Sequence, residues 1–178
     1  MVDAIAWNTT SLGVWTVSTN EITKVSPSGS WDSYNSGQSG TNTSKAYNIY
    51  DLDANNLNVA GWLGYTRATP NGSPEKVMFG FQFPNNDPNC KIIVNGVSKL
   101  TPAYDSSTKF EINMEKDYSY PTFLMDDVVV YTSTVHADFA TPYYISANIT
   151  DAGVTLKGDY EEGGAPTPAF RSWIMGNS

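Results

Sequence analysis

Two glutamates share one strand-like segment and could act together as a pair of carboxylates. In this segment Phe110, Ile112 and Met114 alternate with polar positions that include Glu111 and Glu115. The alternation predicts a β-strand with a buried apolar face and both glutamates on the exposed face. Paired carboxylates serve general acid–base chemistry, but positions i and i+4 of a strand lie about 13 Å apart. The side chains would have to close this gap to about 5–5.5 Å for retaining cleavage of a sugar bond. An ordinary solvated strand face explains the same pattern.

Oxygen-rich segments offer candidate ligands for a metal ion. Residues 51–55 begin like the calcium loop of an EF-hand, but its sixth position is Asn56 and its twelfth is Trp62, where that loop needs Gly and Glu. Residues 85–87 and 126–127 are further oxygen-rich loops, which the turn chemistry of Asn and Asp explains equally well. We therefore expect no metal site and no cofactor, with Ca²⁺ held by these loops as the alternative.

The chain has a single histidine, His136, and a single cysteine, Cys90. A Ser-His-Asp triad would be signalled by a nucleophile motif such as Gly-x-Ser-x-Gly, which is absent. Zinc needs more nitrogen and sulfur ligands than these two residues supply. No internal disulfide can form, so we expect Cys90 to be a buried thiol, with an intermolecular bridge as the alternative. We predict His136 to be a surface or hydrogen-bonded residue.

Aromatic side chains are the remaining candidates for contact with a ligand. Trp31 and Tyr34, with Asp32 between them, precede a loop rich in Gly and Ser, and Trp62 and Tyr65 lie near another loop. Aromatic rings at loops can stack on the apolar face of a sugar, while Asp or Asn bonds its hydroxyls. We take these five residues as the candidate ligand-binding set. Packing in the core is the alternative for each ring, and it is favoured for Trp62, which lies inside a strand.

The elements that would position these residues are short strands separated by turns. Pro, Gly, Asn and Asp interrupt the apolar runs, no segment has a helical period, and Asn95-Gly96 is the strongest hairpin signal. About eleven short strands at regular spacing predict an all-β sandwich. The expected strands and hairpins are residues 15–25, 46–51, 58–65, 76–83, 91–94, 109–115, 123–131, 143–149 and 154–156.

Composition limits the classes of partner. Hydrophobic residues make up 40% of the 178 residues, enough for the core of one domain. The net charge is −8 and the ten Lys and Arg residues are scattered, which disfavours nucleic acid and anionic membranes as partners. No run of about 18 apolar residues could span a membrane, and no signal peptide is visible. Charged residues are only 16%, with Ser, Thr and Asn in their place, as is common on extracellular and virion surfaces.

A series of segments follows an order known from one family. The segments are Trp7, residues 15–25, Gly29–Asp32, Val77–Phe83, Phe110–Met114, Val130–Ser133, Pro142–Ala147 and Asp151–Leu156. Their order resembles the concanavalin A-like lectin/glucanase jelly-roll domains found on phage and viral fibres and on bacterial surface proteins. The resemblance covers roughly residues 5–158 and departs at Asp126-Asp127, where such domains often have Asn-Gly. It implies a two-sheet antiparallel jelly-roll β-sandwich over residues 1–158, followed by a linker-like tail over residues 159–178.

What this resemblance implies is a non-enzymatic module that recognises a glycan or a host receptor. The setting would be a viral fibre, a capsid or a cell-surface protein, on the virion surface or outside the cell. Fibre domains of this kind commonly form homotrimers. A structural or assembly module is the first alternative, with Phe170 and Trp173 contacting a neighbouring chain.

A glycoside hydrolase is the second alternative. The segment Glu111-Ile-Asn-Met-Glu115 resembles the Glu-Ile-Asp-x-Glu strand of retaining β-glucanases with this fold. In them the first Glu is the nucleophile and the last is the general acid/base. Asn113 stands here in place of the intervening Asp and cannot ionise, so the resemblance implies a severe loss of activity. We therefore expect no catalytic residue in this chain.

Overall fold

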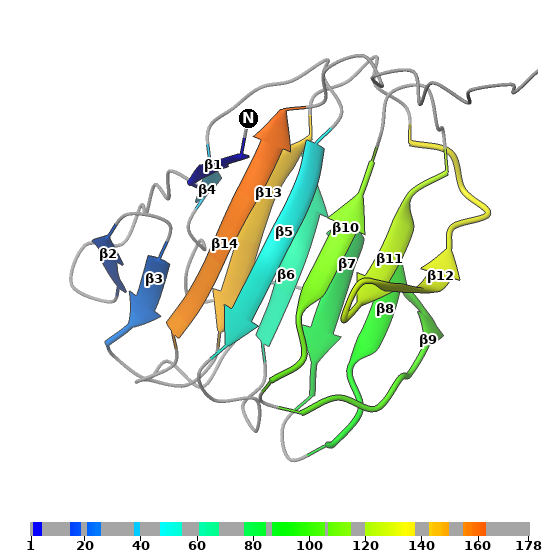
Figure 1. Cartoon of the computed structure of the whole chain (residues 1–178), viewed down its shortest axis with the longest axis horizontal. Coiled ribbons are helices and arrows are strands. Elements are labelled where there is room, and N and C mark those ends of the chain that lie inside the picture. The colour runs from blue at the N-terminus through cyan, green and yellow to red at the C-terminus, as the bar shows by residue number, and fades with distance from the viewer. Residues whose placement is uncertain are drawn as a thin grey trace, which may run out of the picture.

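The computed structural model describes residues 2–4, 15–18, 21–25, 38–39, 47–54, 61–67, 77–84, 87–105, 107–114, 120–137, 143–149 and 155–162. These residues form β-strands and no helix, and every pairing between the described strands is antiparallel. The strands lie in two sheets, one in front of the other (Figure 1). The all-β, two-sheet sandwich predicted from the sequence is therefore confirmed.

The larger sheet contains eight strands, seven of them in the order β12-β11-β10-β5-β14-β3-β2, with β1 paired to β14. Its strands are β1 (Val2–Ala4), β2 (Trp15–Ser18), β3 (Glu21–Lys24), β5 (Tyr47–Ala54), β10 (Phe110–Asn113), β11 (Thr122–Met125), β12 (Val128–Thr132) and β14 (Thr155–Glu162).

The smaller sheet contains six strands in the order β4-β13-β6-β7-β8-β9. Its strands are β4 (Gln38–Ser39), β6 (Gly61–Thr66), β7 (Val77–Phe83), β8 (Lys91–Val94), β9 (Val97–Leu100) and β13 (Tyr144–Ile149). The edge strands β9 and β12, one from each sheet, lie on the same side of the molecule (Figure 1).

Strand β14 extends past the expected end of the sandwich. One of its sides pairs with β5, and the other pairs first with β3 and then with β1. Because Asp159, Tyr160 and Glu161 have partners in both β5 and β1, the boundary drawn after residue 158 falls inside a paired strand. The polar, Gly-rich sequence here predicts a linker, but two flanking strands satisfy its backbone hydrogen bonds and override that local signal.

Two tight turns connect hairpins in the part of the chain that the structure describes. At the β8–β9 turn, Asn95 and Gly96 have φ values of 50° and 72°, the left-handed geometry that Asn-Gly predicts. At the β11–β12 turn, Asp126 and Asp127 adopt φ values of 51° and 64° without a glycine. Backbone hydrogen bonding to Lys109 holds Asp126, which donates its N–H to the Lys109 carbonyl and accepts the Lys109 N–H on its carboxylate at 2.9 Å. These bonds offset the cost of the left-handed conformation.

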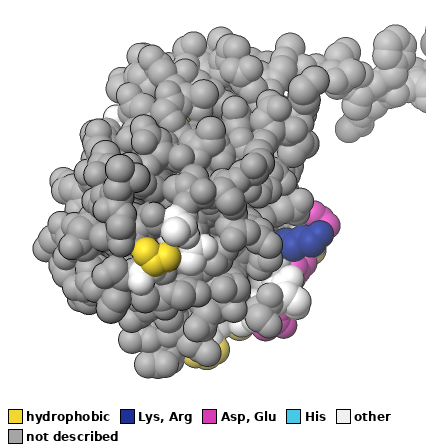
Figure 2. Space-filling model, turned by 90° about the vertical axis from the view of Figure 1, so that its left-hand side faces the viewer, with side chains coloured by type: hydrophobic (Ala, Val, Ile, Leu, Met, Phe, Trp, Pro, Cys, Tyr) yellow, Lys and Arg dark blue, Asp and Glu magenta, His cyan; other side chains and the backbone are white. Residues whose placement is uncertain are grey.

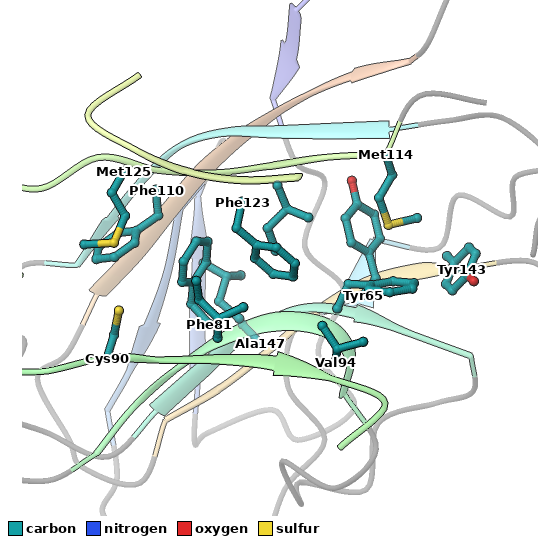
Figure 3. Close-up of a cluster of buried hydrophobic side chains, with 14 of the residues drawn as sticks. Tyr65, Phe81, Cys90, Val94, Phe110, Met114, Phe123, Met125, Tyr143 and Ala147 are labelled. Carbon is teal, nitrogen blue, oxygen red and sulfur yellow. The ribbon is translucent and has the colours of Figure 1, made fainter. Parts of the chain in front are cut away.

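Aromatic rings from both sheets meet in the core, between the two layers (Figure 3). Phe81 of β7 lies 4.9 Å from Phe110 of β10 and 5.5 Å from Phe123 of β11, measured between ring centroids. Phe110 and Phe123 are the buried positions of strands that alternate as the sequence predicts. Cys90 lies in the same cluster, and burial raises the pKa of its thiol to about 12. This confirms the expected buried thiol.

Strands β6 and β7 approach each other at a pair of glycines. Gly64 lies opposite Gly80 in their ladder. A Cβ on Gly64 would stand 2.2 Å from the Phe79 carbonyl oxygen and 2.5 Å from the Gly80 Cα. Only glycine fits this approach without movement of the strands.

Figure 2 shows the side of the molecule on which β2 and β3 lie. Among the side chains described in this view, cationic and acidic groups lie next to each other at one margin. The described part of this side therefore shows mixed charge, not the basic stripe of a nucleic-acid-binding surface.

Candidate functional site

The outer face of the smaller sheet is buried at β6 and β13. Trp62 of β6 points away from the main core, since it alternates with Leu63, and it packs with Val77 and Ile93 in a second buried cluster. Trp62 is 0% exposed, and Thr66 and Ser146, which share a 2.9 Å hydrogen bond between their hydroxyls, are 1% and 0% exposed. A ligand cannot reach these side chains without displacing what covers them.

Two members of the predicted ligand-binding set are therefore core residues in this structure. Trp62 lies in the buried cluster just described, and Tyr65 is 0% exposed in the main core, where its ring meets that of Tyr143 at 6.2 Å. Neither ring offers a face to a sugar, so both take the packing role that the sequence leaves as the alternative. The other three members, Trp31, Asp32 and Tyr34, lie outside the described residues.

The outer face of the larger sheet carries solvent-accessible side chains at the β10–β12 end. Because Phe110 and Ile112 of β10 and Phe123 and Met125 of β11 point into the core, the residues that alternate with them face outward. Strand pairing aligns these outward positions in two rows across three strands. We call this surface the β10–β12 face; its rows are Asn113, Thr122 and Thr132, and Glu111, Leu124 and Val129.

The β10–β12 face combines hydrogen-bonding groups with a small apolar area. Glu111 and Asn113 are half-buried, and Thr132 is exposed. A carboxylate accepts hydrogen bonds, an amide both donates and accepts, and a hydroxyl does either. This mixture can bond a ligand rich in hydroxyl groups. Glu115, the second carboxylate predicted on this face, lies outside the described residues.

An exposed aromatic pair stands next to this face. Tyr120 and His136 lie with ring centroids 3.9 Å apart and an interplanar angle of 43°, and both side chains are exposed. A hydrogen bond of 2.8 Å from the Ser133 N–H to the Pro121 carbonyl holds together the chain segments that carry the rings. Tyr120 comes two residues before Thr122, the middle member of the Asn113–Thr122–Thr132 row, which places the pair beside this row at the start of β11.

The sequence predicts that His136 lies at the surface, and the structure confirms this. The sequence does not predict that Tyr120 is its partner. The two residues are distant in the chain, and only the pairing of β11 with β12 brings them together. The Tyr-Pro step that opens β11 is a usable signal for the end of a strand. Nothing in the sequence indicates which residue meets the tyrosine ring.

Arg67, directly after β6, contacts the ring and the hydroxyl of Tyr143. The Arg67 guanidinium lies 3.9 Å from the centroid of the Tyr143 ring and donates a 2.7 Å hydrogen bond to the Tyr143 hydroxyl. A guanidinium over an aromatic ring is attracted by the negative face of the ring. This contact links β6 to the start of β13 and has a structural role.

The described residues contain no group of three or more His, Cys, Asp and Glu side chains that could hold a metal ion. In the oxygen-rich loop over residues 85–87, the Asp87 carboxylate accepts hydrogen bonds of 2.9 Å from the backbone and the side chain of Asn89. These bonds, the backbone one foremost, lower the pKa of Asp87. Asp87 thus has the turn role that the sequence offers as the alternative to calcium binding.

The part of the chain that the structure describes contains no helix that could span a membrane.

Comparison with known proteins identifies the fold. No protein-family model matches the sequence, and no curated protein matches it. Among solved structures, the chain is similar to the TRIM65 PSpry domain, with TM-score 0.62 and 12% identity over 88% of this chain and 93% of that one. It is similar to a Bacillus licheniformis β-glucanase, with TM-score 0.58 and 10% identity over 92% and 98%. It is also similar to the carbohydrate-binding module CBM66 from Bacillus subtilis, with TM-score 0.52 and 15% identity over 89% and 97%.

These similarities and the two packed sheets define a concanavalin A-like, jelly-roll β-sandwich. At such low identity they establish the fold alone. The same architecture carries a hydrolase and a binding module, so function has to be argued from the side chains of this chain.

Proposed function

We propose that this protein is a non-enzymatic recognition module that binds a glycan on the β10–β12 face. The observation that carries the proposal is the exposed Tyr120–His136 pair beside a row of amide and hydroxyl side chains. Sugar rings stack on aromatic faces, and their hydroxyls bond to polar groups beside them. On β6 and β13 of the smaller sheet, the described outward residues are buried, so these two strands offer no comparable surface. The similarity to a carbohydrate-binding module supports the same reading.

Catalysis is not part of this proposal. Glu111 lies on the β10–β12 face, but Asn113 occupies the position between the two glutamates where β-glucanases, in the motif it resembles, have an ionisable Asp. An amide cannot exchange a proton in the way a carboxyl group does. We expect Glu111 to act as a hydrogen-bond acceptor for sugar hydroxyls.

We propose that the protein is located on the surface of a virion or outside a cell, where its partner is a glycan or a glycosylated receptor. The support is compositional. Charged residues are scarce, and Ser, Thr and Asn take their place in a chain of net charge −8. A fibre, capsid or cell-surface location agrees with this composition.

A glycan array tests the proposal. The purified protein is applied in calcium and again in EDTA, followed by Tyr120→Ala and by Leu100→Ala as a control. Leu100 is exposed to a similar degree but lies on β9. We expect selective binding that Tyr120→Ala weakens about tenfold through the loss of a stacking contact, with Leu100→Ala unchanged. A blank array in both buffers would refute glycan binding, and loss of binding in EDTA alone would reveal a metal in the site.

A hydrolysis assay on β-glucans tests the non-enzymatic part. We expect no turnover, and binding that persists in Glu111→Gln. Turnover that disappears in Glu111→Gln would replace the proposal with the glucanase alternative.

A further inference from the structure

The turn between β8 and β9 brings together an amide side chain and a backbone nitrogen that can react with each other. Its two residues are Asn95 and Gly96, and the side chain of Asn95 is exposed. The backbone nitrogen of the residue after an asparagine can attack the side-chain amide and close a five-membered ring. A glycine at this position makes the attack easy, because no Cβ hinders the nitrogen. Asparagine is accordingly among the thermolabile residues of proteins.

Hydrogen bonds to strand β7 hold both backbone nitrogens of this turn. Asn95 donates its N–H to the Met78 carbonyl at 2.7 Å, and Gly96 donates its N–H to the Val77 carbonyl at 2.8 Å. Both distances are typical of well-formed N–H···O bonds. The attack requires the Gly96 nitrogen to lose its proton and to turn toward the side chain, and it can do neither while it donates to Val77. The closed turn therefore protects Asn95, although the side chain of Asn95 is exposed.

Strand β9, which follows the turn, allows the turn to open. It lies at the edge of the smaller sheet and pairs with β8 alone among the described strands (Figure 1). All four of its residues are exposed, whereas three of the four residues of β8 are buried. Segments that bury little apolar area open locally at a lower free-energy cost than unfolding of the whole domain. Opening of β9 and the turn leaves the core intact and frees the Gly96 nitrogen.

We propose that Asn95 is a modification site, where the side-chain amide converts without an enzyme to aspartate or isoaspartate, and that the bonds of the turn to β7 set the rate. The reaction proceeds from the locally opened turn. This proposal is independent of glycan binding, because no residue of the β10–β12 face takes part.

The reaction needs only water, and nothing is oxidised or reduced. The Gly96 nitrogen gives its proton to solvent and bonds to the Asn95 Cγ, while the bond from Cγ to Nδ2 breaks and the amide leaves as ammonia. Water then adds to one of the two carbonyl carbons of the ring and breaks the bond from that carbon to the nitrogen. Cleavage at Cγ gives aspartate in a normal chain. Cleavage at the main-chain carbonyl carbon gives isoaspartate, in which the main chain runs through Cγ.

The two products differ in their effect on the hairpin. Aspartate tolerates the left-handed conformation, which Asp126 and Asp127 adopt in the β11–β12 turn. Isoaspartate lengthens the main chain between Val94 and Val97, which pair with each other across the turn. The length of a hairpin loop fixes the register of its strands, so the longer link is not compatible with the pairing of β8 and β9. We expect isoaspartate to release β9 permanently.

Peptide mapping by mass spectrometry tests the proposal on the full chain, incubated at neutral pH in buffer, in low urea and in denaturing urea. The sequence has a second Asn-Gly step, Asn71-Gly72, which lies outside the described residues and serves as the internal reference in denaturing urea. We expect both steps to react at similar rates in denaturing urea, and Asn95 to react more than about tenfold more slowly in buffer. Low urea should change the rate at Asn95 little, because local opening exposes little surface.

The variant Val97→Gly tests whether opening of β9 controls the rate. Val97 is 53% exposed, so its replacement weakens the strand and not the core. We expect Asn95 to react severalfold faster in buffer and at an unchanged rate in denaturing urea. The matched control is Val25→Gly, which should leave both rates unchanged, because Val25 is 47% exposed and directly follows β3 in the other sheet. Circular dichroism of each variant checks that it is folded.

Several outcomes would overturn the proposal. Equal rates at Asn95 in buffer and in denaturing urea would show that the bonds to β7 do not protect the turn. An Asn95 that stays unmodified in denaturing urea while Asn71 reacts would exclude a modification site. A rate in buffer that rises with urea in step with global unfolding, or that Val25→Gly raises as much as Val97→Gly, would exclude local opening of β9.

Discussion

Replacing Gly64 by alanine tests how closely the central strands β6 and β7 pack. The nearest atoms to the new Cβ would be the Phe79 carbonyl oxygen at 2.2 Å, the Gly80 Cα at 2.5 Å and the Phe79 carbonyl carbon at 3.0 Å. Real Cβ atoms essentially never come within 3.0 Å of such neighbours. All three neighbours belong to the backbone, so no side chain can turn away. The strands have to separate by about 0.8 Å, the difference between 3.0 and 2.2 Å.

The magnitude follows from two opposing effects. Forcing extra volume into a packed interior costs about 1–3 kcal/mol, and the upper part of this range applies because β7 is held by β6 on one side and β8 on the other. Alanine also restricts the unfolded chain more than glycine does, which stabilises the folded state by about 0.4–1 kcal/mol. We expect the free energy of unfolding to fall by about 2 kcal/mol in Gly64→Ala.

Urea unfolding followed by circular dichroism measures this change, with Gly80→Ala as the matched control. At Gly80 the nearest atom is the Val77 Cγ1 at 2.5 Å, which belongs to a side chain that can rotate, although the Leu63 carbonyl oxygen also lies at 2.7 Å. We expect Gly80→Ala to lose less stability than Gly64→Ala. A Gly64→Ala variant as stable as the parent chain, or a larger loss of stability in Gly80→Ala, would refute this close approach of the two strands.

Three further predictions concern groups outside the β10–β12 face. Cys90 has a pKa of about 12 because it is buried, so a disulfide reagent at pH 8 should label it at least tenfold more slowly than in urea; equal rates would contradict its burial. The Thr66–Ser146 hydrogen bond is buried at 2.9 Å, and a double-mutant cycle with Thr66→Val and Ser146→Ala should give a coupling of about 1 kcal/mol. The Ser107 hydroxyl and backbone N–H lower the pKa of Asp105 below its usual 3.8. The folded state thus binds fewer protons than the unfolded state, and Asp105→Asn should reduce stability at neutral pH and leave it unchanged well below pH 3.8.

Local sequence signals predict the strands that alternate and the turns that need a left-handed residue. Phe110, Ile112 and Met114 are buried as their spacing indicates, and Asn95-Gly96 forms its hairpin turn. These features depend on residues that are close together in the sequence, so the local sequence is enough to predict the buried positions and the turn.

Features that depend on strands distant in the chain are not predictable in this way. The sequence offers Trp62 as either a ligand contact or a core residue, and its burial depends on what covers the outer face of the smaller sheet. The Tyr120–His136 pair depends on the register of β11 and β12. The sheet position of Asp159 depends on β1 and β5, which precede it by more than a hundred residues in the sequence. Each is a tertiary effect that outweighs a local preference.

The central position of β14 bears on how the protein is made in the cell. This strand joins β5, β3 and β1, which are synthesised more than a hundred residues earlier. At about 5–20 residues per second, those strands emerge from the ribosome and wait several seconds for their partner. During that time they have unpaired edges, and pairing between distant segments is slow even afterwards. Completion of the larger sheet is thus a late step in the maturation of the nascent chain, and until then a chaperone that shields unpaired strands would raise the yield of folded protein.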